Sequence, residues 1–319
     1  MALQAPRGTR DILPDEVPYF QFLEDTARSV FERYGYREIR TPMFESTELF
    51  VRGIGEETDI VSKEMYTFQD RKGRSLTLRP EGTAPVVRAM IEHELLKQQG
   101  AQPRVYYIGP MFRYERPQAG RQRQFNTAGV EFFGCPSPLA DAEVIAMMST
   151  YLKALGFAEV RSKVNSIGNT ASRQAYNAEL RQLLAGVKDS LCPDCQRRAE
   201  LNPLRVLDCK VPSCQEHYKS FPALGDFLDA DSCAHYDAVR AALGQLGVDY
   251  IQTPGLVRGF DYYSHTVFET CLAGLGAQDA VAGGGRYDGL VEQLGGAPTP
   301  AVGFGFLTLR LDGEIRTIA

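Results

Sequence analysis

The stretch RVYYIGPMFRYERPQAGRQRQFNTAGVEFFG, residues 104–134, decides the fold class. Two runs rich in aromatic and β-branched residues, 104–115 and 123–134, flank a short segment of proline, glycine and arginine. This pattern predicts an antiparallel pair of strands joined by a long, charged loop. The remaining elements can be placed outward from this pair.

Before the pair, helical spacing of apolar residues covers 15–34, and Gly35 follows as the expected C-cap. Residues 36–47 alternate in polarity and are expected to be extended, with Pro42 restricting them to an edge or an interface. The N-terminal region thus combines a helix with an edge segment.

Two further helices flank the pair. A strand over 75–79 leads through a turn into a helix from about residue 84 to residue 97, with Thr83 as its N-cap. After the pair, an amphipathic helix is expected over 141–155, capped by Asp141.

The next part of the chain differs in character. Residues 170–247 are helical, rich in Ala, Leu and Arg, and are predicted to form an inserted helical domain. Strand-like runs then return at 256–271, 279–283 and 300–306. The prediction is an α+β fold, an antiparallel sheet flanked by helices, in a discontinuous domain of 1–169 and 248–319.

Composition limits the class of protein. The 319 residues include 35 Lys and Arg against 40 Asp and Glu, a formal net charge of −5, so any anion binding must come from local clusters. We expect no membrane helix, because no run of about 18 apolar residues exists. The first residues lack the apolar core of a signal peptide, and the seven cysteines are an odd number, so a reduced, cytoplasmic protein is expected.

The loop of the strand pair is the first candidate site, with arginines at 113, 116, 121 and 123. The planar fork of arginine matches two phosphate oxygens, so several arginines suit a triphosphate. Phe125 could stack on a purine, and Glu115 could accept a hydrogen bond from an exocyclic amine. The alternative is a solvated basic hairpin tip, and spacing alone leaves both open.

Two other segments could bind a small polar ligand. Glu81 and Thr83 lie in a strand-to-helix turn and could hold an ammonium group, although a simple helix cap explains them better. In LVRGFDYYSHTVFE, residues 256–269, Gly259 permits close approach to Arg258, and Tyr262 and Tyr263 could line a polar pocket. An ordinary aromatic strand is the favoured alternative there. In AGGGRYDGL, residues 282–290, three consecutive glycines could bring the backbone close to something flat, and a simple turn is the alternative.

Four cysteines have the spacing of a structural zinc site. Cys192-x2-Cys195 is followed, after thirteen residues, by Cys209-x4-Cys214. The alternative is two pairs of unliganded thiols, which the sequence favours. Cys135, Cys233 and Cys271 are interpreted as core residues.

Taken together, these motifs resemble those of class II aminoacyl-tRNA synthetases, specifically the histidyl-tRNA synthetases. The resemblance runs from about residue 6 to Phe306 and rests on RGTRDILP (7–14), GYREIRTPMFE (35–45), LRPEGT (78–83), FRYERPQAGRQRQF (112–125), NPLRVLDCK (202–210), LVRGFDYYSHTVFE (256–269) and GGGRYDGLVEQLGG (283–296). It implies the catalytic domain of that family and a homodimer formed through residues 18–45.

The resemblance also implies a role for each site residue. ATP would bind in a bent shape, with Arg113 and Arg258 on its α-phosphate and Phe125 stacked on adenine. Arg121 and Arg123 would lie towards the outer phosphates. Histidine would lie beside ATP, in a site formed by Glu81, Thr83, Thr127, Glu131, Arg258, Tyr262 and Tyr263.

The implied chemistry needs alignment and charge neutralisation more than a base. The histidine carboxylate is already ionised, so it can attack the α-phosphorus while two guanidiniums stabilise the transition state. Mg²⁺ would bridge the departing pyrophosphate. The acceptor end of tRNA(His) would then receive the histidyl group, with residues 170–247 against the acceptor stem.

The sequence departs from the family pattern in two places. After Phe125 the family usually has His-Gln, whereas this chain has Asn126-Thr127, and the shorter Thr127 is expected to grip histidine less well. After Phe306 the family continues with Gly-Leu-Glu-Arg, whereas this chain has LTLR. Arg310 keeps the register of an adenine-binding arginine without its neighbours. No anticodon-binding domain is recognisable, so poor tRNA recognition is expected.

Three functions stay open at this stage. The favoured one is a histidine–tRNA ligase. The second is a synthetase-like regulatory subunit of ATP phosphoribosyltransferase, although that group usually lacks LRPEGT and the cysteine-bearing insertion. The third is an inactive histidine-binding paralogue.

Overall fold

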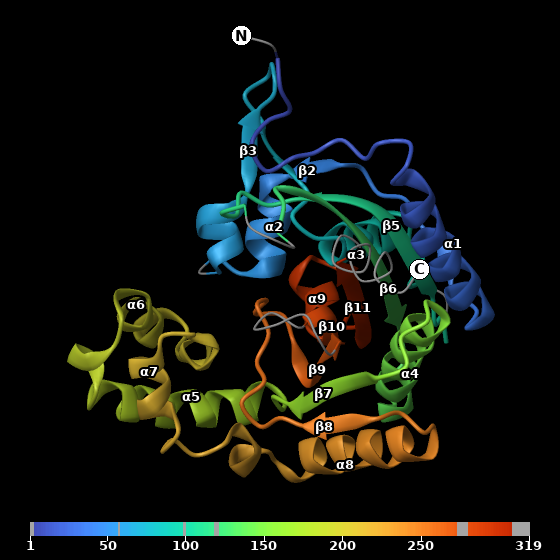
Figure 1. Ribbon diagram of the computed structural model, residues 1–319. Helices are drawn as coiled ribbons and strands as arrows, with labels where there is room; N and C mark the ends of the chain where they lie inside the picture. Colours follow the sequence, from blue (N-terminus) through green and yellow to red (C-terminus); the bar gives the residue numbers. More distant parts are fainter. Residues whose placement is uncertain (1–2, 57, 98–99, 118–120, 273–279, 308–319) are drawn as a thin grey trace.

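The structure is a computed structural model that describes residues 3–56, 58–97, 100–117, 121–272 and 280–307. Within these ranges the core is an eight-stranded sheet in the order β1-β5-β6-β11-β10-β9-β7-β8, accompanied by a three-stranded sheet, β2-β4-β3 (Figure 1). The strands are β1 (Arg37–Glu38), β2 (Phe44–Ser46), β3 (Tyr66–Gln69), β4 (Ser75–Leu78), β5 (Arg104–Phe112), β6 (Gln124–Phe133), β7 (Val160–Ser166), β8 (Tyr250–Gln252), β9 (Ser264–Leu272), β10 (Ala280–Arg286) and β11 (Ala301–Leu307).

The α-helices flank the sheet or form the inserted segment. They are α1 (Val17–Arg33), α2 (Thr47–Ile54), α3 (Thr83–Glu92), α4 (Pro138–Ala154), α5 (Thr170–Ala185), α6 (Pro193–Leu201), α7 (Pro212–Tyr218), α8 (Ala230–Gln245) and α9 (Leu290–Gln293). In the described residues, no helix is both long enough and apolar enough to cross a membrane.

The predicted strand pair is confirmed. β5 and β6 are antiparallel, with Phe112 opposite Gln124 next to the arginine-rich loop. The sheet is antiparallel through its middle, but β1–β5 and β7–β8 at its two ends are parallel. The expectation of an antiparallel sheet is corrected at these ends. β7 and β8 can be parallel because the long helical crossover between them carries the chain back to the end of the sheet at which β7 begins.

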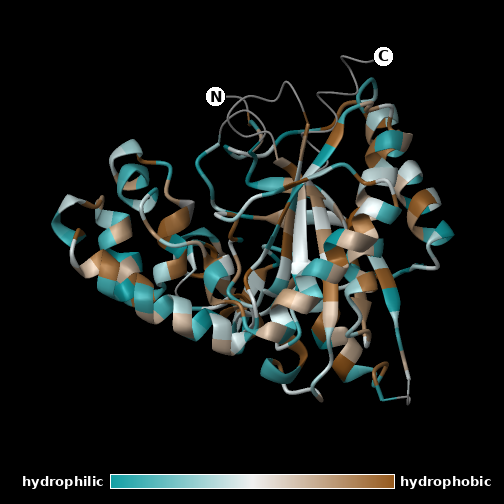
Figure 2. Ribbon diagram, turned by 90° about the horizontal axis from the view of Figure 1, so that it is seen from below, coloured by the Kyte–Doolittle hydropathy of each residue, from teal (hydrophilic) through white to brown (hydrophobic). Residues whose placement is uncertain are grey.

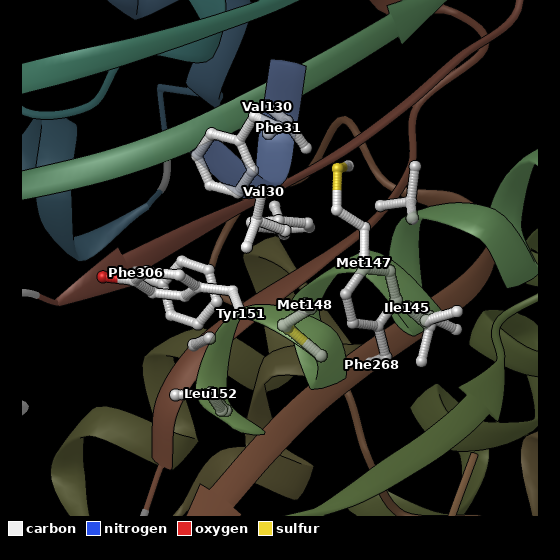
Figure 3. Close-up of a cluster of buried hydrophobic side chains, with 14 of the residues drawn as sticks. Val30, Phe31, Val130, Ile145, Met147, Met148, Tyr151, Leu152, Phe268 and Phe306 are labelled. Carbon is white, nitrogen blue, oxygen red and sulfur yellow. The ribbon is translucent and has the colours of Figure 1, made fainter. Parts of the chain in front are cut away.

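Helices α1 and α4 supply the main core against the sheet. Figure 3 shows Phe31 of α1, Tyr151 of α4 and Phe306 of β11 among its buried side chains. α1 and its Gly35 cap, at a φ of +83°, confirm the prediction for the first helix. Figure 2 shows brown apolar segments along the central strands and more teal on the peripheral helices.

The predicted start of α4 was wrong. The helix begins at Pro138, and the hydroxyl of Ser137 accepts the N–H of Leu139 at 3.2 Å. The helix is buried on most of its circumference, so its sequence lacks the one-sided pattern by which a surface helix is delimited. Asp141, expected as the cap, is fully buried inside the first turn. It pairs there with Arg286 of β10, whose Nε lies 2.9 Å from its Oδ1.

Other predicted boundaries also shift. α3 ends at Glu92 rather than near residue 97, and the strand expected from 256 begins only at Ser264. Residues 256–263 are a loop instead, and the glycine run at 283–285 lies within β10, not in a turn. As a result, residues of the 256–269 motif and of the glycine run lie around one cavity, which is described below.

The segment between the starts of α5 and α8 begins and ends at a single point. Asn169 caps α5 by accepting the N–H of Ser172, and Asp229 caps α8 by accepting the N–H of Ser232. The amide of Asn169 donates directly to the carboxylate of Asp229, so the two helix starts are held together. Figure 1 shows α5, α6 and α7 to one side of the sheet and α8 beneath it. Val239, Ala242 and Leu243 of α8 belong to the same core as α4.

Candidate active site

A cavity of about 370 Å³ opens on one face of the sheet, among β6, β10, β11 and the loop before β9. It brings together ten predicted site residues from distant parts of the chain: Glu81, Thr83, Arg113, Arg121, Phe125, Thr127, Glu131, Arg258, Tyr262 and Tyr263. Strand alternation explains part of this grouping, since side chains two positions apart share a face. Phe125, Thr127 and Glu131 follow that rule along β6.

Glu131 lies at the floor of the cavity and is 1% exposed. Its Oε1 accepts the hydroxyl of Thr83 at 2.7 Å and that of Tyr107 at 3.3 Å, while its Oε2 accepts the hydroxyl of Tyr287. Burial raises the pKa of Glu131 to about 8 against the effect of these donors, and the nearby Glu81 adds to the rise. The floor of the cavity is therefore a carboxyl group whose ionisation changes near neutral pH. Such a group suits a ligand that donates a proton or a hydrogen bond.

Glu81 is the second buried carboxyl group of the cavity, and it corrects the expected cap of α3. Its side chain accepts the N–H groups of Thr83 and Ala84, the latter at 2.9 Å, whereas Thr83 makes no capping bond. Burial raises the pKa of Glu81, with the two backbone donors opposing the shift. Thr83 is thereby free of capping and gives its hydroxyl to Glu131.

Arg113 and Phe125 occupy another part of the cavity wall. The guanidinium carbon of Arg113 lies 5.5 Å from the ring centre of Phe125 and 5.8 Å from that of Phe260. Its Nε donates to the carbonyl of Pro80 at 2.8 Å, which fixes the guanidinium across the turn that carries Glu81. A fixed cation beside a flat apolar ring suits a phosphate attached to a heterocycle.

Arg258 faces the cavity from the loop before β9. Its Nη1 lies 2.8 Å from Oε2 of Glu269, and its Nη2 lies over Gly283, where a Cβ atom would come within 2.3 Å. The first glycine of the run therefore makes room for this guanidinium. Gly303 does the same for Glu131, because a Cβ there would lie 2.0 Å from its Oε2.

Aromatic side chains form a further part of the cavity wall. Tyr262 stacks on Phe260 at 5.1 Å between ring centres and meets Tyr263 at 4.8 Å. Both tyrosines are less than 9% exposed, and burial raises the pKa of each hydroxyl. Thr127 lies in the lining too, opposite Gly109 in the strand pair.

Three predicted residues lie outside the cavity lining. Glu115 pairs with Arg121 at 3.0 Å and so belongs to the support of the lining. The guanidinium of Arg123 stacks over Tyr114 at 3.8 Å and donates to the carbonyl of Arg7, away from the cavity. Arg310 lies outside the described residues.

Sequence reasoning missed Tyr107 and Tyr287, which both hydrogen-bond Glu131. A signal for Tyr287 was present, because Gly283, Gly285 and Tyr287 alternate with Arg286, and Arg286 points to the opposite face, into the core. Glu269 was missed as well. Nothing local distinguishes it, since its partner Arg258 lies on a loop.

Comparison with known proteins agrees with this geometry. A family model described as "Histidyl-tRNA synthetase" matches residues 8–311. A histidine–tRNA ligase of Thermosynechococcus vestitus is 57% identical over 304 residues, covering 95% of this chain and 71% of that protein. One of Koribacter versatilis is 55% identical, with the same coverage of both.

Solved structures give the same result. The apo histidyl-tRNA synthetase of S. aureus superposes with a TM-score of 0.81 at 39% identity, over 100% of this chain and 75% of that one. A Bacillus halodurans protein titled an ATP phosphoribosyltransferase regulatory subunit/histidyl-tRNA synthetase has a TM-score of 0.71 at 24% identity, over 98% and 82% of the two chains. That second likeness shows a shared fold alone. On the family match and the 57% identity, the chain belongs to the histidyl-tRNA synthetase family.

Proposed function

We propose that this chain activates histidine with ATP and transfers the histidyl group to the acceptor end of tRNA(His). One observation carries the proposal. Two guanidiniums, Arg113 and Arg258, line the same cavity as two buried carboxyl groups, Glu81 and Glu131. The cations suit phosphates and a carboxylate, and the carboxyl groups suit an amine and an imidazole. A ligand pair of ATP and histidine meets both needs.

The reaction uses no protein base. The ionised carboxylate of histidine attacks the α-phosphorus, the bond to the outer phosphates breaks, and pyrophosphate leaves. Arg113 and Arg258 hold the α-phosphate and stabilise its growing charge, while Phe125 stacks on adenine. Glu81 and Thr83 hold the α-amino group, and Glu131, Tyr262 and Tyr263 hold the imidazole ring. Arg121 and Arg123 act on the outer phosphates, the latter after a change of side-chain conformation.

Mg²⁺ is proposed as the metal that accompanies ATP. The ion would neutralise charge on the departing pyrophosphate. Glu115, which pairs with Arg121, is proposed to accept a hydrogen bond from the exocyclic amine of adenine.

A homodimer through residues 18–45 is also proposed. Large apolar side chains are exposed in and beside this region, at Phe22 of α1, Met43, and Phe44 of β2, which are 46%, 53% and 51% exposed. Phe68 of β3, 44% exposed, extends the patch, because its ring lies 6.4 Å from that of Phe44. An apolar surface of this kind is typical of an interface.

The activity is tested by histidine-dependent exchange of pyrophosphate into ATP. We expect exchange by the unaltered chain and a loss of at least about 100-fold in Arg258→Ala, the scale of losing one transition-state contact. Arg161→Ala, on the exposed part of β7, is the matched control and should exchange normally. Binding of ATP without any exchange at saturating histidine would instead support the histidine-binding paralogue or the regulatory subunit.

A further inference from the structure

Four cysteines of the inserted segment meet in one cluster. Cys192 and Cys195 lie at the start of α6, Cys209 follows the 3₁₀ helix η3 (Pro203–Asp208), and Cys214 lies in α7. Their sulfur atoms all lie within 4.8 Å of one another. Three of the four residues are buried, and all are free thiols. The fold thus brings together two cysteine pairs that thirteen residues separate in the chain.

The spacing of the sulfurs matches a metal site. Zn–S bonds of about 2.3 Å place the four sulfurs of a tetrahedral Cys₄ site about 3.8 Å apart. The sulfurs of Cys192 and Cys209 are 3.8 Å apart. Among the side chains that the structure describes, the cluster consists of sulfur ligands only. Such an all-sulfur set favours Zn²⁺ over Mg²⁺ or Ca²⁺, which prefer oxygen.

Backbone N–H groups are directed at the sulfurs. The N–H of Cys192 donates to the sulfur of Cys214 at 3.2 Å, and that of Val211 donates to the sulfur of Cys209 at 3.4 Å. Donors of this kind stabilise thiolates and orient them as ligands. Such donors suit sulfurs that carry negative charge, as they do when bound to a metal.

We propose that Cys192, Cys195, Cys209 and Cys214 bind one Zn²⁺ as a structural ion of the inserted segment. This reverses the preference for unliganded thiols that the spacing alone gave. Binding replaces the four thiol protons, which are released to solvent. The ion ties α6, η3 and α7 together, three short helices that have little length to stabilise one another.

The zinc-bound helices also contact the active site. Arg205 of η3 donates to the carbonyl of Arg258 at 3.2 Å, and Arg198 of α6 pairs with Asp59 beside the 60–64 turn. A Cβ atom added to Gly259, next to Arg258, would lie 3.4 Å from Nη1 of Arg205. Loss of the ion is therefore expected to loosen the loop that carries Arg258, as a positioning effect rather than a catalytic one.

Metal analysis of the purified chain tests the proposal. We expect about one zinc per chain, and a loss of zinc in Cys195→Ser and in Cys214→Ser. Cys233, which was expected in the core but is exposed in the structure, provides the matched control: Cys233→Ser should keep the ion. Co²⁺ loaded in place of zinc should give the visible absorption of a tetrahedral thiolate site, and Cys195→Ser should lack it. These readouts do not depend on ligase activity, so they separate failure of this proposal from failure of the proposed function.

Two results would overturn the zinc site. One is a chain from zinc-supplemented culture that holds no metal and has all four thiols free to react. The other is a disulfide between two of these cysteines in the protein as purified. If folding of the serine variants fails, release of zinc on titrating the thiols of the unaltered chain gives the same test.

Discussion

Glu131 shows how a single residue can carry the chemistry of the cavity. Its carboxyl group is buried, yet three hydroxyls point at it, from Thr83, Tyr107 and Tyr287. Burial favours the protonated form, and the hydroxyls favour the ionised one. The resulting pKa of about 8 leaves the group able to respond to an arriving imidazole near neutral pH.

The stability of the ligand-free protein should fall as pH rises, in part because of Glu131. Its folded pKa of about 8 is above its usual 4.5, so its stabilising contribution is complete below about 4.5 and lost as pH rises through about 8. Between pH 6 and 8 the loss is on the order of 2 kcal/mol in the free energy of unfolding. Urea unfolding at the two pH values measures it, and Glu131→Gln should remove most of it. An equal fall in the variant contradicts the assignment, with the exposed Glu92→Gln as control.

Gly283 is a second residue at which a single added atom is expected to change the geometry of the site. A Cβ would lie 2.3 Å from Nη2 of Arg258, which is the mobile end of a long side chain. Gly283→Ala should therefore displace Arg258, lower pyrophosphate exchange by at least about 10-fold, and leave the folded strand intact. Gly289→Ala, where nothing lies within 4 Å, should exchange normally. Normal exchange by Gly283→Ala would show that Arg258 needs no such space.

At the scale of elements, sequence patterns predicted the existence of helices and strands better than their ends. The two runs rich in aromatic and β-branched residues in 104–134, with the proline, glycine and arginine segment between them, predicted β5, β6 and their antiparallel pairing. The start of α4 was missed because a helix buried on most sides has no polar face to mark its limits. Five of the ten cavity residues lie outside the 104–134 stretch. Grouping them needed the family resemblance, because no local pattern brings Glu81 and Arg258 to β6.

The buried pair of Asp141 and Arg286 joins α4 to β10. Both side chains are fully buried, and Arg286 also donates to the carbonyls of Cys135 and Ser137. The pKa of Asp141 is lowered by Arg286 and His235 despite burial, so the pair contributes stability above the usual carboxyl pKa and loses it in acid. The link is therefore charged at neutral pH.

Removing the charge of Asp141 should destabilise the protein strongly. Asp141→Asn leaves a buried guanidinium without its counter-ion, which costs about 3–5 kcal/mol in the free energy of unfolding. Chemical denaturation at pH 7 measures the change. Asp288→Asn removes the other, partly exposed, partner of Arg286 and should cost far less. Equal losses in the two variants would show that the Asp141–Arg286 pair contributes no more to stability than the Asp288–Arg286 pair.

At the scale of the whole molecule, the sheet topology could not be predicted in full. The parallel ends of the sheet depend on β1 and β8, which are two and three residues long. Segments this short leave no periodic signal. Their pairing is set by the tertiary positions of β5 and β7.

The exposed apolar patch on α1, β2 and β3 provides a prediction for the assembly. Phe44→Asp places a charge beside Phe68 on this exposed apolar surface and should shift the proposed homodimer towards monomer. Sedimentation velocity measures the species, and Leu246→Asp, on the far end of α8, is an exposed apolar control of similar size. A monomeric unaltered chain would contradict the proposed interface directly.

The paired caps Asn169 and Asp229 have a consequence for how this chain could have been assembled. Because Asn169 and Asp229 are hydrogen-bonded, the segment of about sixty residues between them begins and ends at the same place. If this segment were removed, a very short link could join the two ends of the remaining chain. A gene could therefore gain or lose this segment in one event without a change in the position of any strand. The same position is suited to the insertion of a different domain into the synthetase fold by protein engineering.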